Sequence, residues 1–176
     1  MTALRRLKKL LGPSWDFFVN DQTSGDAGND ERMAYFFNRN KVRFRNLIGE
    51  IVYSRDELLD GNQQSRTPFF ASFQAGWFRF TLCSAHIVSS DKPDKPTRKQ
   101  EIEQIGNTLK TRANKEDEVH VFLGDFNQDD MDDAGLVALQ ELGFTVPDFG
   151  ATNLGLDKKH FDHITFIGPK LEGDLM

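Results

Sequence analysis

The chain has 176 residues, of which 38% are hydrophobic and 28% are charged, and its net charge is -5. These values are normal for one globular domain and exclude disordered and collagen-like chains. The acidic balance argues against coating of nucleic acid over a wide surface but leaves room for a local anion site or a bound cation. No apolar run approaches the roughly 20 residues that span a bilayer, and the start lacks the hydrophobic region of a signal peptide. The single cysteine, Cys83, has no partner for an intramolecular disulfide. We therefore expect a cytoplasmic protein that binds no membrane.

The segment from Thr2 to Pro13 has leucines at helical spacing and is predicted to form a helix. Thr2 can cap its start, and Gly12 with Pro13 ends it. We expect the leucine stripe to be buried and the basic cluster to be a solvated face rather than a phosphate contact. The leucines are Leu4, Leu7, Leu10 and Leu11, and the basic residues are Arg5, Arg6, Lys8 and Lys9.

Seven later segments are rich in aromatic and β-branched residues, which predicts strands. Two segments with helical periodicity interrupt them, from Arg98 to about Ala113 and from Gly135 to Leu142. Strands that arrive singly and as hairpins, with helices between them, predict a mixed sheet covered by helices rather than a purely parallel one. The predicted strands are 15–19, 33–37, 42–53, 68–73, 77–87, 119–124 and 161–167.

Three of these strands contain or end in polar residues. The run "TLCSAHI" closes on His86, "VFLGDFN" contains Asp125 and Asn127, and "KHFDHITF" contains Asp162 and His163. Because residues i and i+2 of an extended chain point the same way, Asp125 and Asn127 are expected to face one side together. A strand-end Asp alone is often a turn cap, and a lone His is often a hydrogen-bonded core residue. Polar groups are costly to bury without a partner, so the three together predict a site at the ends of the strands.

These motifs resemble the endonuclease/exonuclease/phosphatase superfamily, typified by deoxyribonuclease I. "GDFN" follows an apolar strand, "SAHI" lies about forty positions upstream, and "FDHITF" lies about forty positions downstream. The segments "ERMAYFFNRNKVRF" and "RTPFFASF" extend the resemblance over nearly the whole chain. It implies an α/β (α+β) sandwich of two packed mixed β-sheets flanked by helices, with residues 1–176 forming a single partial domain.

The resemblance also implies roles for individual residues. Asn127 would donate to a phosphate oxygen, and Asp125 would orient the nucleophile or form part of a metal site. His86 would hydrogen-bond the phosphate, and Arg32 would bind it. Asp162 would hold the general-base histidine in the correct tautomer. The implied cofactor is Mg²⁺ or Mn²⁺.

The sequence departs from the family pattern at both ends. The family domain spans roughly 250 residues or more; it begins with a strand ending in Asn and a second strand carrying a metal-binding Glu, and it closes on a strand with an Asp-His pair whose His is the general base. Neither the two N-terminal strands nor the C-terminal strand is found here, so we expect a domain truncated at both ends. "FDHI" resembles the terminal pair only superficially, and His163 is expected to be a neighbour of the site rather than the base.

The function implied is metal-dependent hydrolysis of phosphate esters, most directly of phosphodiester bonds in DNA or RNA by an endonuclease or exonuclease. A phosphatase or phosphodiesterase acting on a small-molecule or lipid phosphate is an alternative, which the net acidity favours. A non-catalytic fragment or interaction module that retains the fold is another. The short chain alone is expected to be inactive, and exposed sheet edges are expected to promote oligomerisation.

Overall fold

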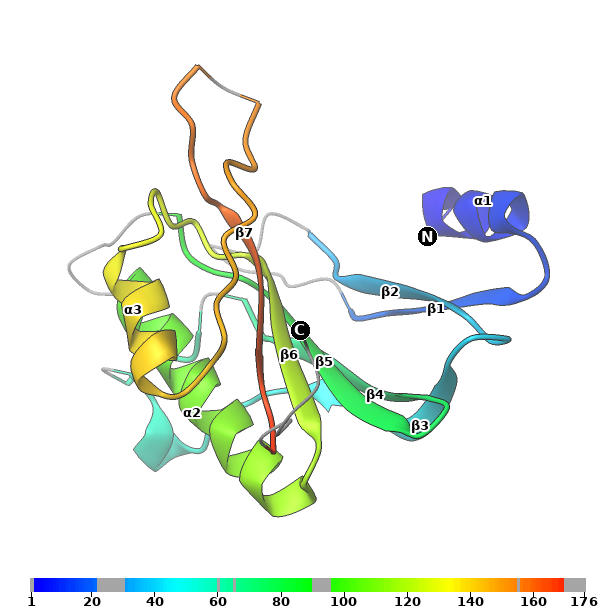
Figure 1. Ribbon diagram of the computed structural model, residues 1–176, viewed down its shortest axis with the longest axis horizontal. Coiled ribbons are helices and arrows are strands. Elements are labelled where there is room, and N and C mark those ends of the chain that lie inside the picture. Colours follow the sequence, from blue (N-terminus) through cyan, green and yellow to red (C-terminus); the bar gives the residue numbers. More distant parts are fainter. Residues whose placement is uncertain are drawn as a thin grey trace.

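The computed structural model describes residues 2–21, 31–59, 61–64, 66–89, 96–154 and 156–169. Strands dominate the first half of these residues, and helices separate the later strands (Figure 1). The order is α1 (Thr2–Leu11), β1 (Trp15–Val19), β2 (Ala34–Asn38), β3 (Arg43–Glu50), η1 (Arg55–Glu57), β4 (Phe69–Ala75), β5 (Phe78–His86), α2 (Arg98–Glu116), β6 (Val119–Asp125), α3 (Ala134–Glu141) and β7 (Asp162–Ile167).

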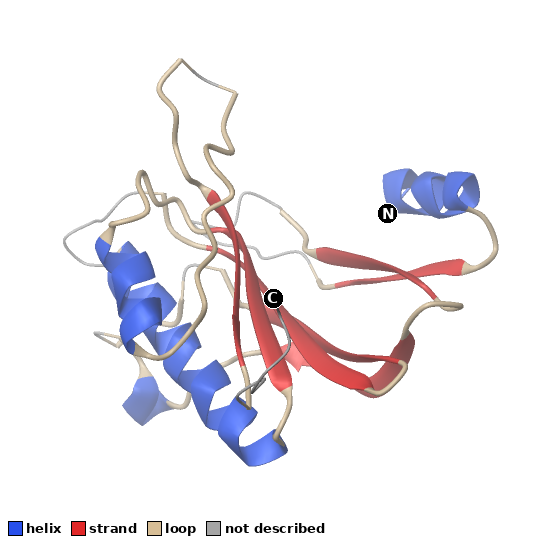
Figure 2. Ribbon diagram, in the orientation of Figure 1, coloured by secondary structure: helices blue, strands red, loops and turns tan. Residues whose placement is uncertain are grey.

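The strands form two sheets, which confirms the predicted α/β sandwich. One is the β1–β2 hairpin, and the other has the order β3-β4-β5-β6-β7. All neighbours in the larger sheet are antiparallel except β5 and β6, which are parallel and are joined through α2. Figure 2 shows α2 and α3 on one side of the larger sheet and the hairpin with α1 on the other.

Each side of the larger sheet has its own apolar core, because successive strand residues point to opposite faces. On the helix side, Cys83, Ala85 and Phe122 pack against α2 and α3. On the hairpin side, Phe69 and Phe73 of β4 pack against aromatic residues of β1 and β2. Cys83 is buried as expected, and burial raises the pKa of its thiol to about 12.

The prediction of a buried leucine stripe on α1 is wrong. The helix forms over the expected residues, but none of its side chains is buried, and Leu10 is 77% exposed. The helix is joined to the hairpin by an ion pair in which Lys8 Nζ lies 2.7 Å from the Asp16 carboxylate. Leu4 is partly buried, and Leu7 and Leu11 are 42% and 39% exposed. Helix periodicity thus predicted the amphipathic pattern but not its neighbours.

Other boundaries moved by a few residues. The predicted strand 42–53 ends at Glu50, because Ile51 bonds to the carbonyl of Pro68, and proline has no N–H with which to continue the ladder. The predicted loop 54–67 contains the short helix η1, and α2 continues to Glu116. The predicted loop 89–97 lies largely outside the described residues. None of the described helices is long and apolar enough to cross a bilayer.

Candidate functional site

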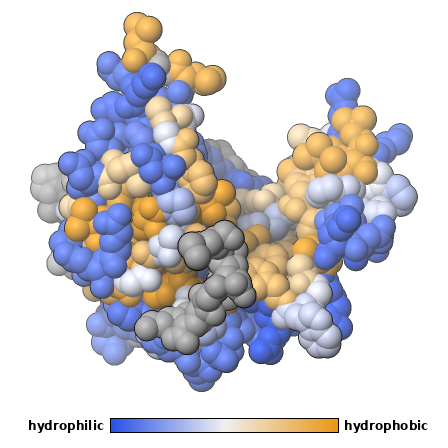
Figure 3. Space-filling view, in the orientation of Figure 1, coloured by the Kyte–Doolittle hydropathy of each residue, from blue (hydrophilic) through white to orange (hydrophobic). Residues whose placement is uncertain are grey.

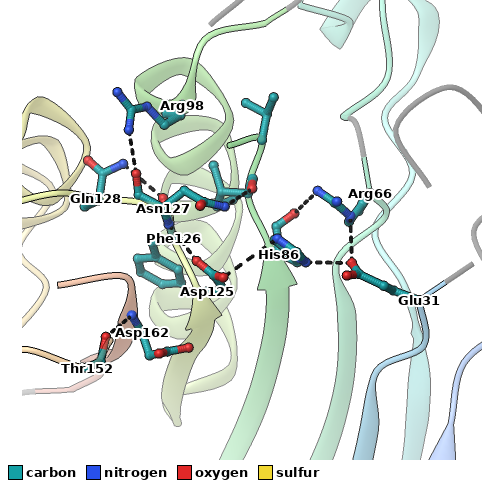
Figure 4. Close-up of polar contacts among 12 residues, drawn as sticks. Glu31, Arg66, His86, Arg98, Asp125, Phe126, Asn127, Gln128, Thr152 and Asp162 are labelled. Atoms are coloured by element: carbon teal, nitrogen blue, oxygen red, sulfur yellow. Dashed lines mark hydrogen bonds and ion pairs between the residues drawn. The ribbon is translucent and has the colours of Figure 1, made fainter. Parts of the chain in front are cut away.

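Three of the predicted site residues are neighbours at one end of the larger sheet. His86, the last residue of β5, pairs with Asp125 at the end of β6, and Asp125 pairs with Asp162 at the start of β7. Figure 4 shows these residues with their polar contacts. A cavity of about 410 Å³ opens beside them. Its lining residues are Asn20, Glu31, Arg32, Met33, Arg66, Ser84, Ala85, His86, Gly124 and Asp125.

His86 lies between two carboxylates. Its Nδ1 is 2.7 Å from the Glu31 carboxylate, and its Nε2 is 3.8 Å from the carboxylate of Asp125. An ionised carboxylate only accepts hydrogen bonds, so Nδ1 donates to Glu31. This fixes the tautomer of the neutral ring and leaves Nε2 on the side of Asp125. The longer distance to Asp125 leaves Nε2 without a direct hydrogen bond to it.

Arg66 and Glu31 belong to the cavity, and the sequence prediction missed both. Arg66 is only 8% exposed, and its Nε lies 3.1 Å from the same Glu31 oxygen that contacts His86. Each lies in a segment that had been singled out: Glu31 adjoins Arg32 in "ERMAYFF", and Arg66 opens "RTPFFASF". The position of Arg66 just before an apolar strand was the feature of the sequence that could have indicated its place in the site. Arg32, the predicted phosphate ligand, lines the same cavity.

Asp125 is a half-buried carboxylate with opposing influences on its charge. Burial raises the pKa of its carboxyl above the ordinary value, and the charge of Asp162 acts in the same direction. The backbone N–H of Asn127 donates to it over 2.9 Å, and this bond and His86 lower the same pKa. The net result is a raised pKa, so Asp125 is a better proton acceptor than an exposed aspartate.

Gly124 allows this arrangement because no larger residue fits there. Its φ is +135°, a conformation that residues with side chains rarely adopt. A Cβ at this position would lie 2.0 Å from the carbonyl oxygen of Ala85. The glycine therefore lets β6 approach β5 closely where His86 and Asp125 meet.

The expectation that Asp125 and Asn127 point the same way along one strand is wrong. The strand stops at Asp125, whose side chain accepts the Asn127 N–H and forms a local turn. Asn127 itself has φ of +50°, and its amide donates to the Ile87 carbonyl over 2.7 Å. Arg98 Nη1 donates to the Asn127 carbonyl over 2.6 Å. Asn127 lies beside Asp125, but it fastens the loop to β5 and does not line the cavity.

Phe126 and His163 lie on the helix-covered face, opposite the cavity. Phe126 is fully buried, and its ring contacts Phe122 at 4.3 Å and His163 at 5.4 Å between centroids. His163 is buried and bonds through Nε2 to the His160 carbonyl. Burial lowers the pKa of its imidazole. His163 thus supports the loop from behind and does not reach the cavity.

Asp162 is exposed at the start of β7 and faces the same side of the sheet as Asp125. Its backbone N–H donates to the Thr152 hydroxyl over 3.0 Å. Within the described part of the chain, its carboxylate makes no hydrogen bond to an imidazole. The general-base partner implied by the resemblance is therefore not supplied by these residues.

The described residues do not form a complete site for Mg²⁺ or Mn²⁺. Nowhere in them do three His, Cys, Asp or Glu side chains gather as a metal cage. Asp125 and Glu31 both line the cavity, but Glu31 is engaged by His86 and Arg66. Of the two carboxylates that line the cavity, Asp125 is the one not paired with a guanidinium and left as a hard oxygen ligand of the kind these ions prefer.

No family model and no curated protein matches this sequence. Solved structures do match it. An endonuclease/exonuclease/phosphatase family protein from Bacteroides thetaiotaomicron has a TM-score of 0.66 and 18% identity over 96% of this chain. The human Nocturnin catalytic domain with a bound sulfate anion has a TM-score of 0.65 and 12% identity over 94%. A mannosyl-6-phosphatase of B. thetaiotaomicron VPI-5482 has a TM-score of 0.63 and 17% identity over 92%.

The chain has the fold of these proteins. This confirms the resemblance inferred from the motifs at the level of the fold. The chain spans only 66%, 62% and 66% of the length of the three structures. About a third of each of these structures therefore has no counterpart in this chain.

Proposed function

We propose that this chain carries the phosphate-binding part of a hydrolase that acts on phosphate esters. Cleavage of phosphodiester bonds in nucleic acid is the first candidate reaction of the complete domain. The cavity at the ends of β5 and β6 supports this proposal: Arg32 and Arg66 supply positive charge, and His86 supplies an oriented imidazole beside the carboxylate of Asp125. Guanidinium groups suit phosphate oxygens in both charge and geometry.

The proposed roles follow from these positions. Arg66, held against Glu31, would stabilise the negative charge that develops on the phosphoryl oxygens. His86, whose Nδ1 donates to Glu31, would add a hydrogen bond from Nε2 only when both ring nitrogens carry a proton. Asp125, with its raised pKa, would orient the attacking water and accept its proton. Asn127 would act mainly by holding the loop, because its amide already donates to Ile87.

Mg²⁺ or Mn²⁺ is retained as the proposed cofactor of a complete domain, where it would polarise the phosphate. The described residues contribute only Asp125 to such a site. We therefore expect weak binding of Mg²⁺ to the 176-residue chain and poor turnover by it. Saturation at micromolar Mg²⁺ in a calorimetric titration would contradict this expectation.

A phosphatase acting on a small phosphate ester is a second candidate. The cavity volume of about 410 Å³ lies within the range of small-molecule sites. The match to a mannosyl-6-phosphatase over 92% of the chain favours the same reading. Calorimetry with inorganic phosphate, mannose 6-phosphate and a short DNA oligonucleotide would separate the two candidates, because a nucleic-acid site binds the oligonucleotide more tightly than either small ligand.

The test of the shared proposal is Arg66→Met, with Arg55→Met as the matched control. Arg55 is exposed in η1 and does not line the cavity. A charge-assisted hydrogen bond contributes about 1.5–3 kcal/mol, so we expect phosphate affinity to fall at least about tenfold in Arg66→Met and to stay unchanged in the control. Thermal unfolding of both variants would show whether they remain folded. Equal phosphate affinity in the two folded variants would refute the proposed site.

Activity is tested separately on plasmid DNA, an abasic duplex and p-nitrophenyl phosphodiesters with Mg²⁺ and Mn²⁺. We expect the chain to match its Asp125→Ala variant at background. Turnover that depends on Asp125 would show that these residues suffice for catalysis and that the expectation of inactivity is wrong.

A further inference from the structure

The first turn of α2 lies against the loops that follow β5 and β6. Two of its side chains bond to these loops, Arg98 at the start of the helix and Glu101 three residues later. Thr97 caps the helix and forms a capping box with Gln100, which fixes the backbone at this end. The buried apolar side chains of α2 pack on the larger sheet and on α3. This turn is therefore a rigid base beside the candidate site.

Arg98 holds the loop after β6 through a backbone carbonyl. Its Nη1 donates to the Asn127 carbonyl over 2.6 Å, as Figure 4 shows. Asn127 has a φ of +50°, a left-handed conformation that costs energy unless surrounding contacts hold it. In the same turn the Asn127 N–H donates to the Asp125 carboxylate over 2.9 Å. Arg98 therefore holds the residue that orients Asp125.

Glu101 holds the loop after β5. Its side chain is only 1% exposed, and its carboxylate accepts a hydrogen bond from the Val88 N–H over 3.1 Å. Val88 lies two residues beyond His86. A buried carboxylate is costly without hydrogen bonds, so this contact fixes the position of the loop backbone. The loops after β5 and β6 are also joined to each other, because the Asn127 side chain donates to the Ile87 carbonyl over 2.7 Å.

The same turn of α2 also holds the segment that carries Arg66. Gln64 is buried, and its side-chain amide donates to the Glu101 carbonyl over 3.3 Å. Arg66 lies two residues beyond Gln64. His86 and Asp125 likewise lie two residues from positions that bond to this turn. Three side chains of the cavity, from three separate segments, are therefore placed by one turn of one helix.

We propose that Arg98 and Glu101 are positioning residues for the phosphate cavity. Neither lines the cavity, so they act through the backbone of the loops beside it. His86 Nε2 and the Asp125 carboxylate lie 3.8 Å apart, too far for a direct hydrogen bond, and this pair does not fix its own spacing. Bonds from charged groups of the helix to the loops supply that constraint. This role rests on the proposed function, which makes phosphate the ligand of the cavity.

Asp129 extends the contact from α2 to the loop that precedes β7. Its carboxylate lies 3.8 Å from Arg98 Nη1 and 3.0 Å from Lys159 Nζ, and its carbonyl accepts the His160 N–H over 3.2 Å. These bonds lie at the base of the loop, whereas its tip carries exposed hydrophobic residues (Figure 3). Lys159 keeps the base attached when Arg98 is replaced. A variant at Arg98 therefore tests the turn at Asn127 rather than the whole loop.

The first test measures amide hydrogen exchange, which needs no ligand. Arg98→Met removes the donor to the Asn127 carbonyl, and we expect exchange of the Asn127 amide, which is bonded to Asp125, to become at least about tenfold faster. Lys99→Met, at the next and exposed position of α2, is the matched control and should leave this exchange unchanged. The Phe122 amide, in the middle of β6, reports global unfolding. An increase at Asn127 no larger than the increase at Phe122 would refute the proposal.

The second test measures the affinity for inorganic phosphate by calorimetry. Glu101→Gln keeps an oxygen that can accept the Val88 N–H, whereas Glu101→Leu removes it. We expect affinity to fall about tenfold in Arg98→Met and in Glu101→Leu, the lower end of what the loss of an orienting partner costs at metal sites. Glu101→Gln and Lys99→Met should bind as the wild type does. Thermal unfolding shows which variants fold, and Arg98→Met with Glu101→Gln completes the test if Glu101→Leu does not.

The outcomes separate this role from the proposed function. If the wild-type chain binds no phosphate, the proposed function fails, and exchange at Asn127 still decides whether Arg98 holds the turn. If phosphate binds and only Arg66→Met weakens it, the cavity stands and the positioning role is refuted. Equal losses of affinity in Glu101→Gln and Glu101→Leu would overturn the role of the bond to Val88, because only the charge of Glu101 would then matter.

Discussion

The two faces of the larger sheet are made by the same strands, but they differ in what covers them. On the helix side, Phe122, Ile105 and Leu139 are fully buried between the sheet and the two helices. On the hairpin side, the fully buried residues of the larger sheet are Phe69, Ala71 and Phe73 of β4, whereas Ile164 of β7 stays 50% exposed among the described residues. The candidate site lies at the end of this open face, where His86 and Asp125 meet. The helix side thus contains the buried core that stabilises the sheet, and the hairpin side carries the candidate phosphate site.

Phe122→Ala should give the largest effect, because it removes a fully buried ring from the helix-side core. We expect the free energy of unfolding to fall by about 3–5 kcal/mol, the usual cost of deleting a buried phenylalanine side chain. Chemical denaturation measures the change. A loss below about 1 kcal/mol would contradict the assignment of the stable core to this face.

Gly124→Ala should cause the second-largest loss of stability, because it affects the contact between the two strands that carry the site. The positive φ and the 2.0 Å approach to the Ala85 carbonyl both oppose a methyl group. We expect a loss of roughly 1–3 kcal/mol of stability from backbone strain, together with weaker phosphate binding. Gly76→Ala is the matched control: its φ is +58°, but a Cβ there meets no atom within 4 Å. A smaller loss of stability in Gly124→Ala than in the control would contradict the steric argument.

His120 should make stability depend on pH through the helix-covered face. It is fully buried, and burial lowers the pKa of its imidazole below the ordinary value of 6.5 against the opposing influence of Glu116, whose carboxylate lies 3.3 Å from Nε2. Well above pH 6.5 the ring is neutral in both states, and this residue costs no stability. As pH falls, the unfolded chain takes up the proton first, so stability is lost by at most about 1.4 kcal/mol per pH unit for this residue.

The measurement is urea denaturation of the wild-type chain and His120→Leu between pH 7 and pH 5. The variant should lose less stability over this range. It should keep part of the slope, because burial lowers the pKa of His163 as well. Identical slopes for the two proteins would show that His120 is protonated equally in the folded and unfolded states.

Ile164→Ser should have the smallest effect on stability, since half of this side chain is exposed on the open face. We expect a change within about 0.5 kcal/mol, as for most surface positions. The same substitution at Ile105, fully buried on the helix side, is the comparison. If both changes cost the same, Ile164 is covered in solution, and the open face is closed by a partner or a second copy.

Local patterns in the sequence determined the elements and the three strand ends that carry the site. Alternation predicted the strands because side chains on a strand point alternately to opposite faces. His86 and Asp125 were predictable because a polar residue closing an apolar run is a local feature, and Asp162 because a polar residue within an otherwise apolar strand is one too. The parallel pairing of β5 and β6 and the antiparallel pairing of β7 then bring the three together.

Only the tertiary structure decided which other residues complete the cavity and which faces stay open. Glu31 and His86 are 55 positions apart, and neither segment alone shows that a hydrogen bond joins them. The turn at Asn127 and the exposure of the α1 leucines also went against local expectation. The turn depends on the Asp125 carboxylate, which accepts a hydrogen bond from the backbone N–H of Asn127. Burial of a helix depends on whether another element covers it. Residue spacing fixes which side of an element is apolar, but it carries no information about what packs against that side.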